Sequence, residues 1–255
     1  MGATENLMMA SVFTRGVTVI RNCAKEPEIS DLQNFLNAMG ARVSGAGSSM
    51  ITVEGVERLH GVTYTPIPDR IIAGTYMIAT AMCGGNVTLD GVVPEHLSSL
   101  IAKMSKTACK VICKNDKISV RSKGRLKSLE RIDTMYYPGF PTDLQTQIMA
   151  LQTISRGTSV IAENIFETRF KTVPQLIKMG ADITVRDRTA VVRGVPGLHG
   201  AEVHATDLRG GASLVLAGLA AEGRTEVKDI YHIDRGYEDM APVLSGLGAN
   251  ITRVV

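Results

Sequence analysis

The sequence predicts a mixed α/β (α+β) fold built from one small unit that is used four times. In each copy an apolar stretch with helical spacing ends at a glycine, and a short run rich in β-branched residues follows. These glycines are Gly16, Gly85, Gly157 and Gly223, which lie 69, 72 and 66 residues apart. A near-constant period of this length indicates a repeated supersecondary unit. Helices that alternate with strands in one chain are typical of α/β and α+β proteins.

A second block recurs in the other half of each unit. Residues 39–43 (Met-Gly-Ala-Arg-Val) match residues 179–183 and 247–251, and residues 107–111 form a weaker copy. The first and third copies also agree beyond this block, where residues 53–61 match residues 192–200. Both halves of the unit are therefore repeated, which favours a structural repeat over a short shared motif.

The third copy has the clearest local signals. Pro141, Thr142 and Asp143 form a helix-start signal, because the Asp143 carboxylate can accept hydrogen bonds from first-turn amides. Apolar residues then recur at helical spacing until Gly157 ends the helix. The elements expected after it are a buried strand at 158–162, a second helix at 173–179, a hairpin of strands at 182–186 and 190–193, and a further strand at 201–204.

Bulk composition restricts the class of protein. The 255 residues are 44% hydrophobic and 21% charged, and no apolar stretch has the length of a membrane helix. No charged-then-apolar signal peptide opens the chain, so we expect a cytoplasmic protein with reduced cysteines and no membrane partner. The spacings of cysteine and histidine support no metal site.

The charge distribution argues against nucleic-acid binding. The net charge is only +3, although residues 103–131 hold ten lysines and arginines against two acidic residues. A polyanion site would also need interleaved aromatic side chains, and this stretch has none. A solvated basic face is the interpretation that we favour.

Two arginines fall in the first turns of predicted helices. Arg70 follows Asp69, and Arg209 follows Asp207, which we expect to act as a helix cap. A cation there opposes the helix dipole by roughly 0.3–1 kcal/mol. Each arginine could bind an anionic ligand together with the helix amides, or it could pair with a surface carboxylate. The second interpretation is favoured for Arg70, and both stay open for Arg209.

Several long runs resemble the C-terminal part of the UDP-N-acetylglucosamine enolpyruvyl transferases, a family of the EPSP synthase-like superfamily. The matching runs are residues 140–145 (Phe-Pro-Thr-Asp-Leu-Gln), 163–170 (Glu-Asn-Ile-Phe-Glu-Thr-Arg-Phe), 205–209 (Ala-Thr-Asp-Leu-Arg), 212–218 (Ala-Ser-Leu-Val-Leu-Ala-Gly) and 231–237 (Tyr-His-Ile-Asp-Arg-Gly-Tyr). The resemblance covers essentially all 255 residues, in order and at the family's spacing. These runs argue against the sister enzyme that uses shikimate phosphate.

The resemblance implies a particular version of the α/β fold. Members are built from βαβαββ units arranged as an inside-out α/β barrel, with helices inside each domain, sheets outside, and substrates between two domains. Residues 1–67 then look like the last repeat of a first domain, and residues 68–255 look like a second domain of three repeats. The hinge is expected near residues 65–68, where Pro66 and Pro68 interrupt the pattern.

The resemblance also implies an activity and a set of site residues. The family transfers the enolpyruvyl group of phosphoenolpyruvate to the 3-hydroxyl of UDP-N-acetylglucosamine, without a cofactor. Asp143 matches the aspartate proposed as the base, which also contacts the sugar, and Ile165 matches a residue whose main chain contacts the sugar nucleotide. Arg209, Arg235 and Arg169 match arginines that face phosphoenolpyruvate and phosphate. Taken alone, Arg169 could instead pair with Glu167, and Arg235 with Asp234.

An N-terminal stretch of the family has no counterpart in this sequence. It carries a lysine–asparagine pair and a mobile loop with the general-acid cysteine, and none of the four cysteines here lies in such a loop. The fold is therefore expected to be incomplete at its N-terminus, and the isolated chain to be inactive. The missing half or self-association would supply a partner. The alternative is a non-catalytic fragment that binds a UDP-sugar or an anion and serves in regulation.

Overall fold

The computed structural model describes residues 1–254, which form two compact units. The first unit comprises Met1–Pro68 together with Tyr136–Gly139, and the second comprises Asp69–Met135 together with the residues from Phe140 onward. The boundary after Pro68 lies in a segment, residues 55–69, that has neither helix nor strand. Two prolines in this segment fix the backbone angle φ and lack the amide hydrogen that a helix or sheet needs.

The first unit holds one copy of the repeat, without the strand that leads into its first helix. Its elements are α1 (Gly2–Ser11), β1 (Val17–Arg21), α2 (Pro27–Ala38), β2 (Arg42–Ser44) and β3 (Met50–Glu54). The strands form an antiparallel sheet in the order β1-β3-β2. Helices α1 and α2 contact each other and the sheet, so alternate residues of β3, namely Ile51 and Val53, are completely buried.

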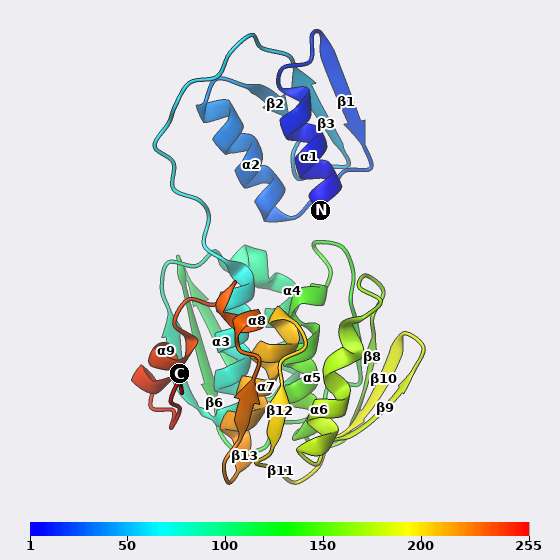
Figure 1. Cartoon of the computed structure of the whole chain (residues 1–255), viewed down its shortest axis with the longest axis vertical. Coiled ribbons are helices and arrows are strands. Elements are labelled where there is room, and N and C mark those ends of the chain that lie inside the picture. The colour runs from blue at the N-terminus through cyan, green and yellow to red at the C-terminus, as the bar shows by residue number, and fades with distance from the viewer. Residues whose placement is uncertain (255) are drawn as a thin grey trace. The chain divides into compact units, whose positions relative to one another are not determined.

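Three helices form the centre of the second unit. They are α3 (Arg70–Cys83), α5 (Gln145–Thr153) and α7 (Leu208–Ala220), and each contacts the other two. Every residue of α5 is buried, including the polar residues Gln145, Gln147 and Gln152. Small residues permit the close approach: a Cβ on Gly74 of α3 would lie 2.6 Å from a methyl carbon of Leu144. Figure 1 shows the three helices side by side, with strands around them.

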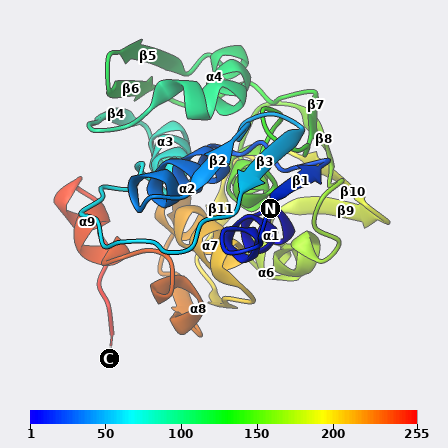
Figure 2. The ribbon, with the colours of Figure 1, turned by 90° about the horizontal axis from the view of Figure 1, so that it is seen from above.

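Each central helix lies against its own sheet on the outside of the unit. The strands are β4 (Gly85–Leu89), β5 (Lys110–Lys114), β6 (Lys117–Ser122), β7 (Arg131–Asp133), β8 (Thr158–Ala162), β9 (Asp182–Arg186), β10 (Thr189–Arg193), β11 (Leu198–His199), β12 (Glu202–His204), β13 (Ala221–Glu222) and β14 (Glu226–Lys228). Helix α3 contacts the sheet β4-β6-β5, α5 contacts β7-β8-β10-β9, and α7 contacts the pairs β11-β13 and β12-β14. Figure 2 shows the first two sheets on different sides of the helices.

Shorter helices complete the second unit. They are α4 (Ser98–Met104), α6 (Val173–Lys178), α8 (Tyr231–Asp234) and α9 (Met240–Gly246), with the 3-10 turns η1 (Pro94–Leu97), η2 (Ser105–Thr107), η3 (Thr142–Leu144) and η4 (Arg169–Thr172). Helices α5 and α7 connect parallel strands, since β7 pairs in parallel with β8 and β12 with β14. The predicted order of helix, strand, helix and hairpin is therefore confirmed in the third copy. The strands and α6 agree within one residue, but α5 ends at Thr153, four residues before the glycine that was expected to end it.

Equivalent hydrogen bonds show that the sequence repeat is also a structural repeat. The amide of Gly55 donates to the carbonyl of Gly16, and the amide of Gly194 donates to the carbonyl of Gly157, both at 2.9 Å. The amides of His60 and His199 likewise donate to the carbonyls of Met39 and Met179. In each case the donor and the acceptor of one copy align with the donor and the acceptor of the other copy.

The last copy departs from the expected pattern. Residues 249–251 match the first residues of β9, but among residues 1–254 they belong to no strand. In the three other copies the second hairpin strand, which is β3, β6 or β10, lies in the centre of its sheet. No such strand lies beside β14 in the described residues. An isolated strand at this position would have no partner for its backbone hydrogen bonds.

One repeat carries a strained residue at a position where the other three have glycine. Gly40, Gly180 and Gly248 have φ values of 99°, 91° and 97°, and the equivalent Ala108 has φ of 72°. A Cβ in this left-handed region costs roughly 1–2 kcal/mol, which is offset in part by the greater freedom of glycine in the unfolded chain. We therefore expect Ala108→Gly to raise the free energy of unfolding by up to about 1 kcal/mol. Urea denaturation measures it, and a loss of stability would contradict the strain.

Candidate active site around Asp143

Three segments that are distant in the sequence meet at Asp143. Asp143 lies in η3, Arg169 begins η4, and Arg209 lies in the first turn of α7. The Nη2 atom of Arg169 is 3.3 Å from Asp143 Oδ1, and the Nε atom of Arg209 is 3.2 Å from the same oxygen. The structure thus brings together three of the five residues that the sequence singled out.

The Asp143 side chain does not cap the helix that it precedes. Neither η3 nor α5 receives a side-chain cap, so the interpretation of Asp143 as an N-cap is wrong. The turn begins where the sequence predicted, but the carboxylate points to the two guanidinium groups instead. A charged acceptor between two charged donors forms stronger hydrogen bonds than it would form with neutral amides.

Arg209 is held by its own helix and by a buried tyrosine. Asp207 caps α7 as expected, since it accepts from the amides of Arg209 at 3.0 Å and Gly210 at 2.9 Å. The Arg209 guanidinium lies 5.9 Å from the centre of the Tyr237 ring. Burial by itself would lower the pKa of Arg209, but Asp143 and Tyr237 outweigh it and raise the pKa above its usual value. Arg209 is therefore a permanent cation in a largely buried position.

Tyr237 connects this arginine to the interior of the unit. Its hydroxyl lies 2.9 Å from the hydroxyl of Thr75 in α3, and Gln147 of α5 donates to it at 3.3 Å. The hydroxyl of Thr146 donates to the carbonyl of Arg209 at 2.9 Å. All three central helices therefore contribute to the position of Arg209.

Arg169 is the most deeply buried cation of the site. Only 6% of the residue is exposed, and its guanidinium lies 4.5 Å from the centre of the Phe166 ring. Its Nε donates to the hydroxyl of Thr142 at 3.2 Å. It does not pair with Glu167, which binds Arg188 instead. The alternative of a Glu167 salt bridge is thus wrong for Arg169.

Ile165 is tied to the same region through its main chain. Its amide donates to Oε1 of Glu163 at 2.9 Å, and the amide of Phe166 does so at the same distance. Glu163 is 1% exposed and was not singled out from the sequence. The sequence did contain a signal for Glu163, because this residue directly follows the predicted buried strand. A glutamate that is buried at such a position needs several hydrogen-bond donors.

Arg235 does not join the Asp143 cluster. It is exposed at the C-terminal end of α8, and among residues 1–254 it has no ion pair. Its neighbour Asp234 pairs with Arg253 at 2.7 Å, so the expected alternative of an Arg235–Asp234 salt bridge is wrong. Arg70, the other arginine at a helix start, is 8% exposed, and Asp69 caps its helix.

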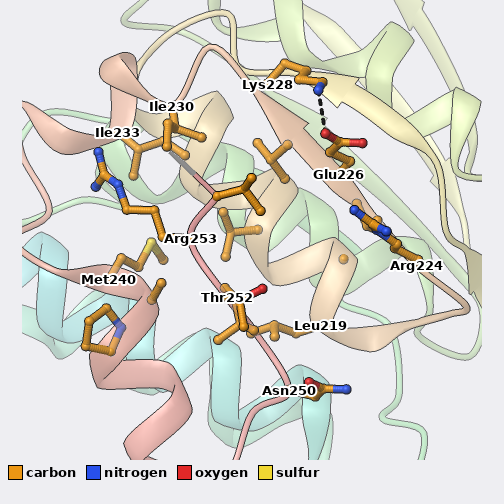
Figure 3. A pocket seen from close by; sticks show the side chains of 18 of the residues that line it. Leu219, Arg224, Glu226, Lys228, Ile230, Ile233, Met240, Asn250, Thr252 and Arg253 are labelled. Atoms are coloured by element: carbon orange, nitrogen blue, oxygen red, sulfur yellow. Dashed lines mark hydrogen bonds and ion pairs between the residues drawn. The ribbon is translucent and has the colours of Figure 1, made fainter.

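A separate pocket of about 730 Å³ lies elsewhere in the second unit. It is bounded by α7, β14, α9 and residues 250–254, and Figure 3 shows its side chains. Four of its charged groups form two ion pairs, Glu226 with Lys228 and Asp234 with Arg253, and its lining also includes apolar residues such as Ile230 and Met240. None of the five predicted site residues lines it. We place the candidate site at Asp143, because polar groups from three segments converge there.

No metal or membrane-spanning element accompanies this site in residues 1–254. No cluster of three or more His, Cys, Asp or Glu side chains in this range could hold a metal ion. The same residues include no helix with the length and hydrophobicity needed to cross a bilayer.

The fold is that of the enolpyruvyl transferases. Residues 1–244 match the family model described as EPSP synthase (3-phosphoshikimate 1-carboxyvinyltransferase), and the chain belongs to this family. In the solved structures it is similar to the enolpyruvyl transferase NikO from Streptomyces tendae, with a TM-score of 0.89 and 28% identity over 98% of this chain and 60% of that one. EPSP synthase from Acinetobacter baumannii shares the fold, with a TM-score of 0.71 and 19% identity.

Curated relatives give a finer comparison. UDP-N-acetylglucosamine 1-carboxyvinyltransferase 2 of Caldanaerobacter subterraneus is 53% identical over 254 residues, which are 100% of this chain and 61% of that relative. The enzyme numbered 1 from the same organism is 56% identical, over 99% of this chain and 60% of its own length. A relative of the same name from Myxococcus xanthus is 53% identical over 98% of this chain and 59% of its length. The chain thus spans about 60% of the length of these relatives.

Proposed function

We propose that this chain is the larger part of a UDP-N-acetylglucosamine enolpyruvyl transferase. The reaction moves the enolpyruvyl group of phosphoenolpyruvate to the 3-hydroxyl of UDP-N-acetylglucosamine and releases inorganic phosphate. The observation that carries the proposal is the Asp143 carboxylate between the guanidinium groups of Arg169 and Arg209. Relatives with more than 50% identity that bear this enzyme's name support it.

The proposed chemistry assigns a role to each group. Asp143 accepts the proton of the sugar hydroxyl as the oxygen attacks the enolpyruvyl carbon. Arg169, Arg209 and Arg235 neutralise the carboxylate and phosphate of phosphoenolpyruvate and the charge on the departing phosphate. The main chain of Ile165 contacts the sugar nucleotide. The general acid for the methylene carbon comes from the part of the relatives that this chain does not match.

The wider assignments belong to the same proposal. Residues 1–67 are the last repeat of a first domain, and residues 68–255 are a second domain of three repeats. The enzyme is cytoplasmic, and its product enters peptidoglycan synthesis, on which cell shape and division depend. No cofactor, nucleic acid or membrane takes part.

A coupled phosphate-release assay tests the activity. The purified chain alone should show no turnover, whereas the chain joined to the unmatched segment of the Caldanaerobacter relative should release phosphate when both substrates are present. A folded fusion that binds neither substrate would overturn the proposal. A fusion that binds UDP-N-acetylglucosamine without turnover would support the second candidate, a non-catalytic fragment.

Arg235→Lys provides a sharper test of one assignment. An ammonium group does not replace the two parallel hydrogen bonds of a guanidinium to a carboxylate or phosphate. In the active fusion, KM for phosphoenolpyruvate should rise by about tenfold or more, with little change in KM for the sugar nucleotide. Arg253→Lys is the matched control, because Arg253 is an exposed arginine nearby that pairs with Asp234. An unchanged KM for phosphoenolpyruvate would remove Arg235 from the site.

A further inference from the structure

Glu163 is a buried charged residue that the proposed chemistry does not use. It follows β8, and its neighbour in space, Thr134, follows β7. Because β7 and β8 are adjacent parallel strands, their carboxyl ends lie at one edge of the sheet. The Glu163 amide also donates to the carbonyl of Arg188 in the β9–β10 turn, at 2.8 Å. The residue is therefore fixed to the sheet through its backbone.

The carboxylate of Glu163 accepts four hydrogen bonds. Its Oε1 atom accepts from the hydroxyl of Thr134 at 2.7 Å and from the amides of Ile165 and Phe166 at 2.9 Å. Its Oε2 atom accepts from the hydroxyl of Thr142 at 3.0 Å. Four donors offset the cost of burying a charge, and a carboxylate makes stronger hydrogen bonds than a neutral acceptor.

These bonds join the two segments that carry the proposed site. Thr142 immediately precedes Asp143, and its oxygen also accepts from Nε of Arg169. Since the Thr142 hydroxyl gives its proton to Glu163, its lone pairs face Arg169. The other carboxylate oxygen, Oε1, fixes the main chain of Ile165 and of Phe166, whose ring packs on Arg169.

We propose that Glu163 is a positioning residue that sets the geometry of Asp143 and Arg169 through Thr142, and that of the Ile165 main chain directly. The expected effect of Glu163 on sugar-nucleotide affinity rests on the proposed function. Its expected effect on the geometry of Asp143 and Arg169 does not depend on that function. A residue that served stability alone would leave the Arg169 hydrogen bonds unchanged when one of its own contacts was lost.

The geometric test uses the whole chain and the arginine Nε–H signals in proton–nitrogen NMR spectra. Glu163→Gln keeps an oxygen for the three donors at Oε1 but places an NH₂ group opposite Thr142, so the Thr142 proton loses its acceptor. We expect the Arg169 Nε–H signal to shift and its hydrogen exchange to accelerate by about tenfold, although Glu163 does not touch Arg169. Thr142→Val should do the same, and Thr142→Ser should restore the parent signal. Thr107→Val is the control, since Thr107 is a fully buried threonine bonded to Met104.

The binding test adds the sugar nucleotide. UDP-N-acetylglucosamine should bind about tenfold more weakly to Glu163→Gln and Thr142→Val than to the parent and Thr142→Ser, by calorimetry on chains confirmed as folded. Absence of binding to the parent chain and to the active fusion would contradict the proposed function, and the NMR result would still decide the geometric role. An Arg169 signal that is unchanged in Glu163→Gln would overturn the inference, because Thr142→Val also removes the direct acceptor of Arg169. Equal changes in Thr107→Val would do so as well.

Discussion

Asp143→Asn is expected to reduce the turnover of the active fusion by about 10²–10⁴-fold, the usual contribution of a general base. The substitution keeps the size of the side chain and one oxygen that can accept a hydrogen bond. It removes the negative charge and the ability to take the proton of the sugar hydroxyl. KM for UDP-N-acetylglucosamine should change little, because the amide can still contact the hydroxyl. Equal losses in turnover and in sugar-nucleotide affinity would mean that Asp143 only binds.

The same substitution should strengthen the binding of inorganic phosphate. Without a ligand, Asp143 is the counterion of two arginines whose side chains are only 8% and 16% exposed. An incoming anion has to compete with this carboxylate for the same donors. Removal of the charge ends the competition, and we expect phosphate to bind the purified chain about tenfold more tightly, which corresponds to roughly 1.4 kcal/mol.

Calorimetric titration with phosphate measures this gain. Asp182→Asn is the matched control, because Asp182 pairs with the exposed Arg193 at 3.2 Å on the outer sheet and should leave phosphate affinity unchanged. Loss of two charge-assisted hydrogen bonds should also lower the free energy of unfolding by about 1–3 kcal/mol. A lower phosphate affinity in Asp143→Asn would show that the carboxylate orients the two arginines for phosphate, and does not compete with phosphate for their N–H groups.

Gly194→Ala is expected to destabilise the second unit by about 3 kcal/mol or more. A Cβ at this position would lie 1.7 Å from the backbone carbonyl oxygen of Ser155. Backbone cannot move aside as a side chain can, and Gly194 is held by three neighbours. Its amide donates to Gly157, its carbonyl accepts from Arg125 at 2.9 Å, and the next amide, that of Val195, donates to Thr153 at 2.7 Å. Relief of the clash would break at least one of these bonds.

Chemical denaturation of Gly194→Ala and Gly197→Ala makes the comparison direct. Gly197 is three residues away, and nothing lies within 4 Å of a Cβ placed there. Its substitution should change the free energy of unfolding by no more than about 0.5 kcal/mol. The repeat makes a parallel prediction for Gly55, where the nearest atom, the carbonyl oxygen of Thr14, would be 1.8 Å away. Similar stabilities of the Gly194 and Gly197 variants would refute the close backbone approach.

Local sequence signals located the regular elements because their causes are local. Local patterns gave β8 and the β9–β10 hairpin within one residue, and they located α5 but not its end, which lies four residues before Gly157. Residues 249–251 repeat residues 181–183, which lead into β9, but they form no strand. A helix satisfies its own backbone hydrogen bonds, whereas a strand depends on a neighbour that local sequence cannot reveal.

Side-chain partners were predicted less well than helices and strands. Asp143 was placed correctly at a helix start, yet its carboxylate binds Arg169 and Arg209, which lie 26 and 66 residues away. Local reasoning also paired Arg169 and Arg235 with the acidic residues nearest in sequence, whereas Glu167 and Asp234 bind other arginines. An ion pair forms between charged groups that lie close together in space. The sequence holds many possible partners of opposite charge and does not show which of them the fold brings close.

By itself the sequence determined the repeated α/β unit, the order of its elements and the kinship with enolpyruvyl transferases, since these follow from periodicity and from long matching runs. Only the tertiary structure decided that one carboxylate lies between two buried guanidinium groups, that Tyr237 supports Arg209, and that Glu163 joins the segments of Asp143 and Ile165. The reason is physical: helix and strand formation depends mainly on neighbours along the chain, whereas a buried polar group selects its partners from whatever the packed helices and sheets bring within about 3 Å.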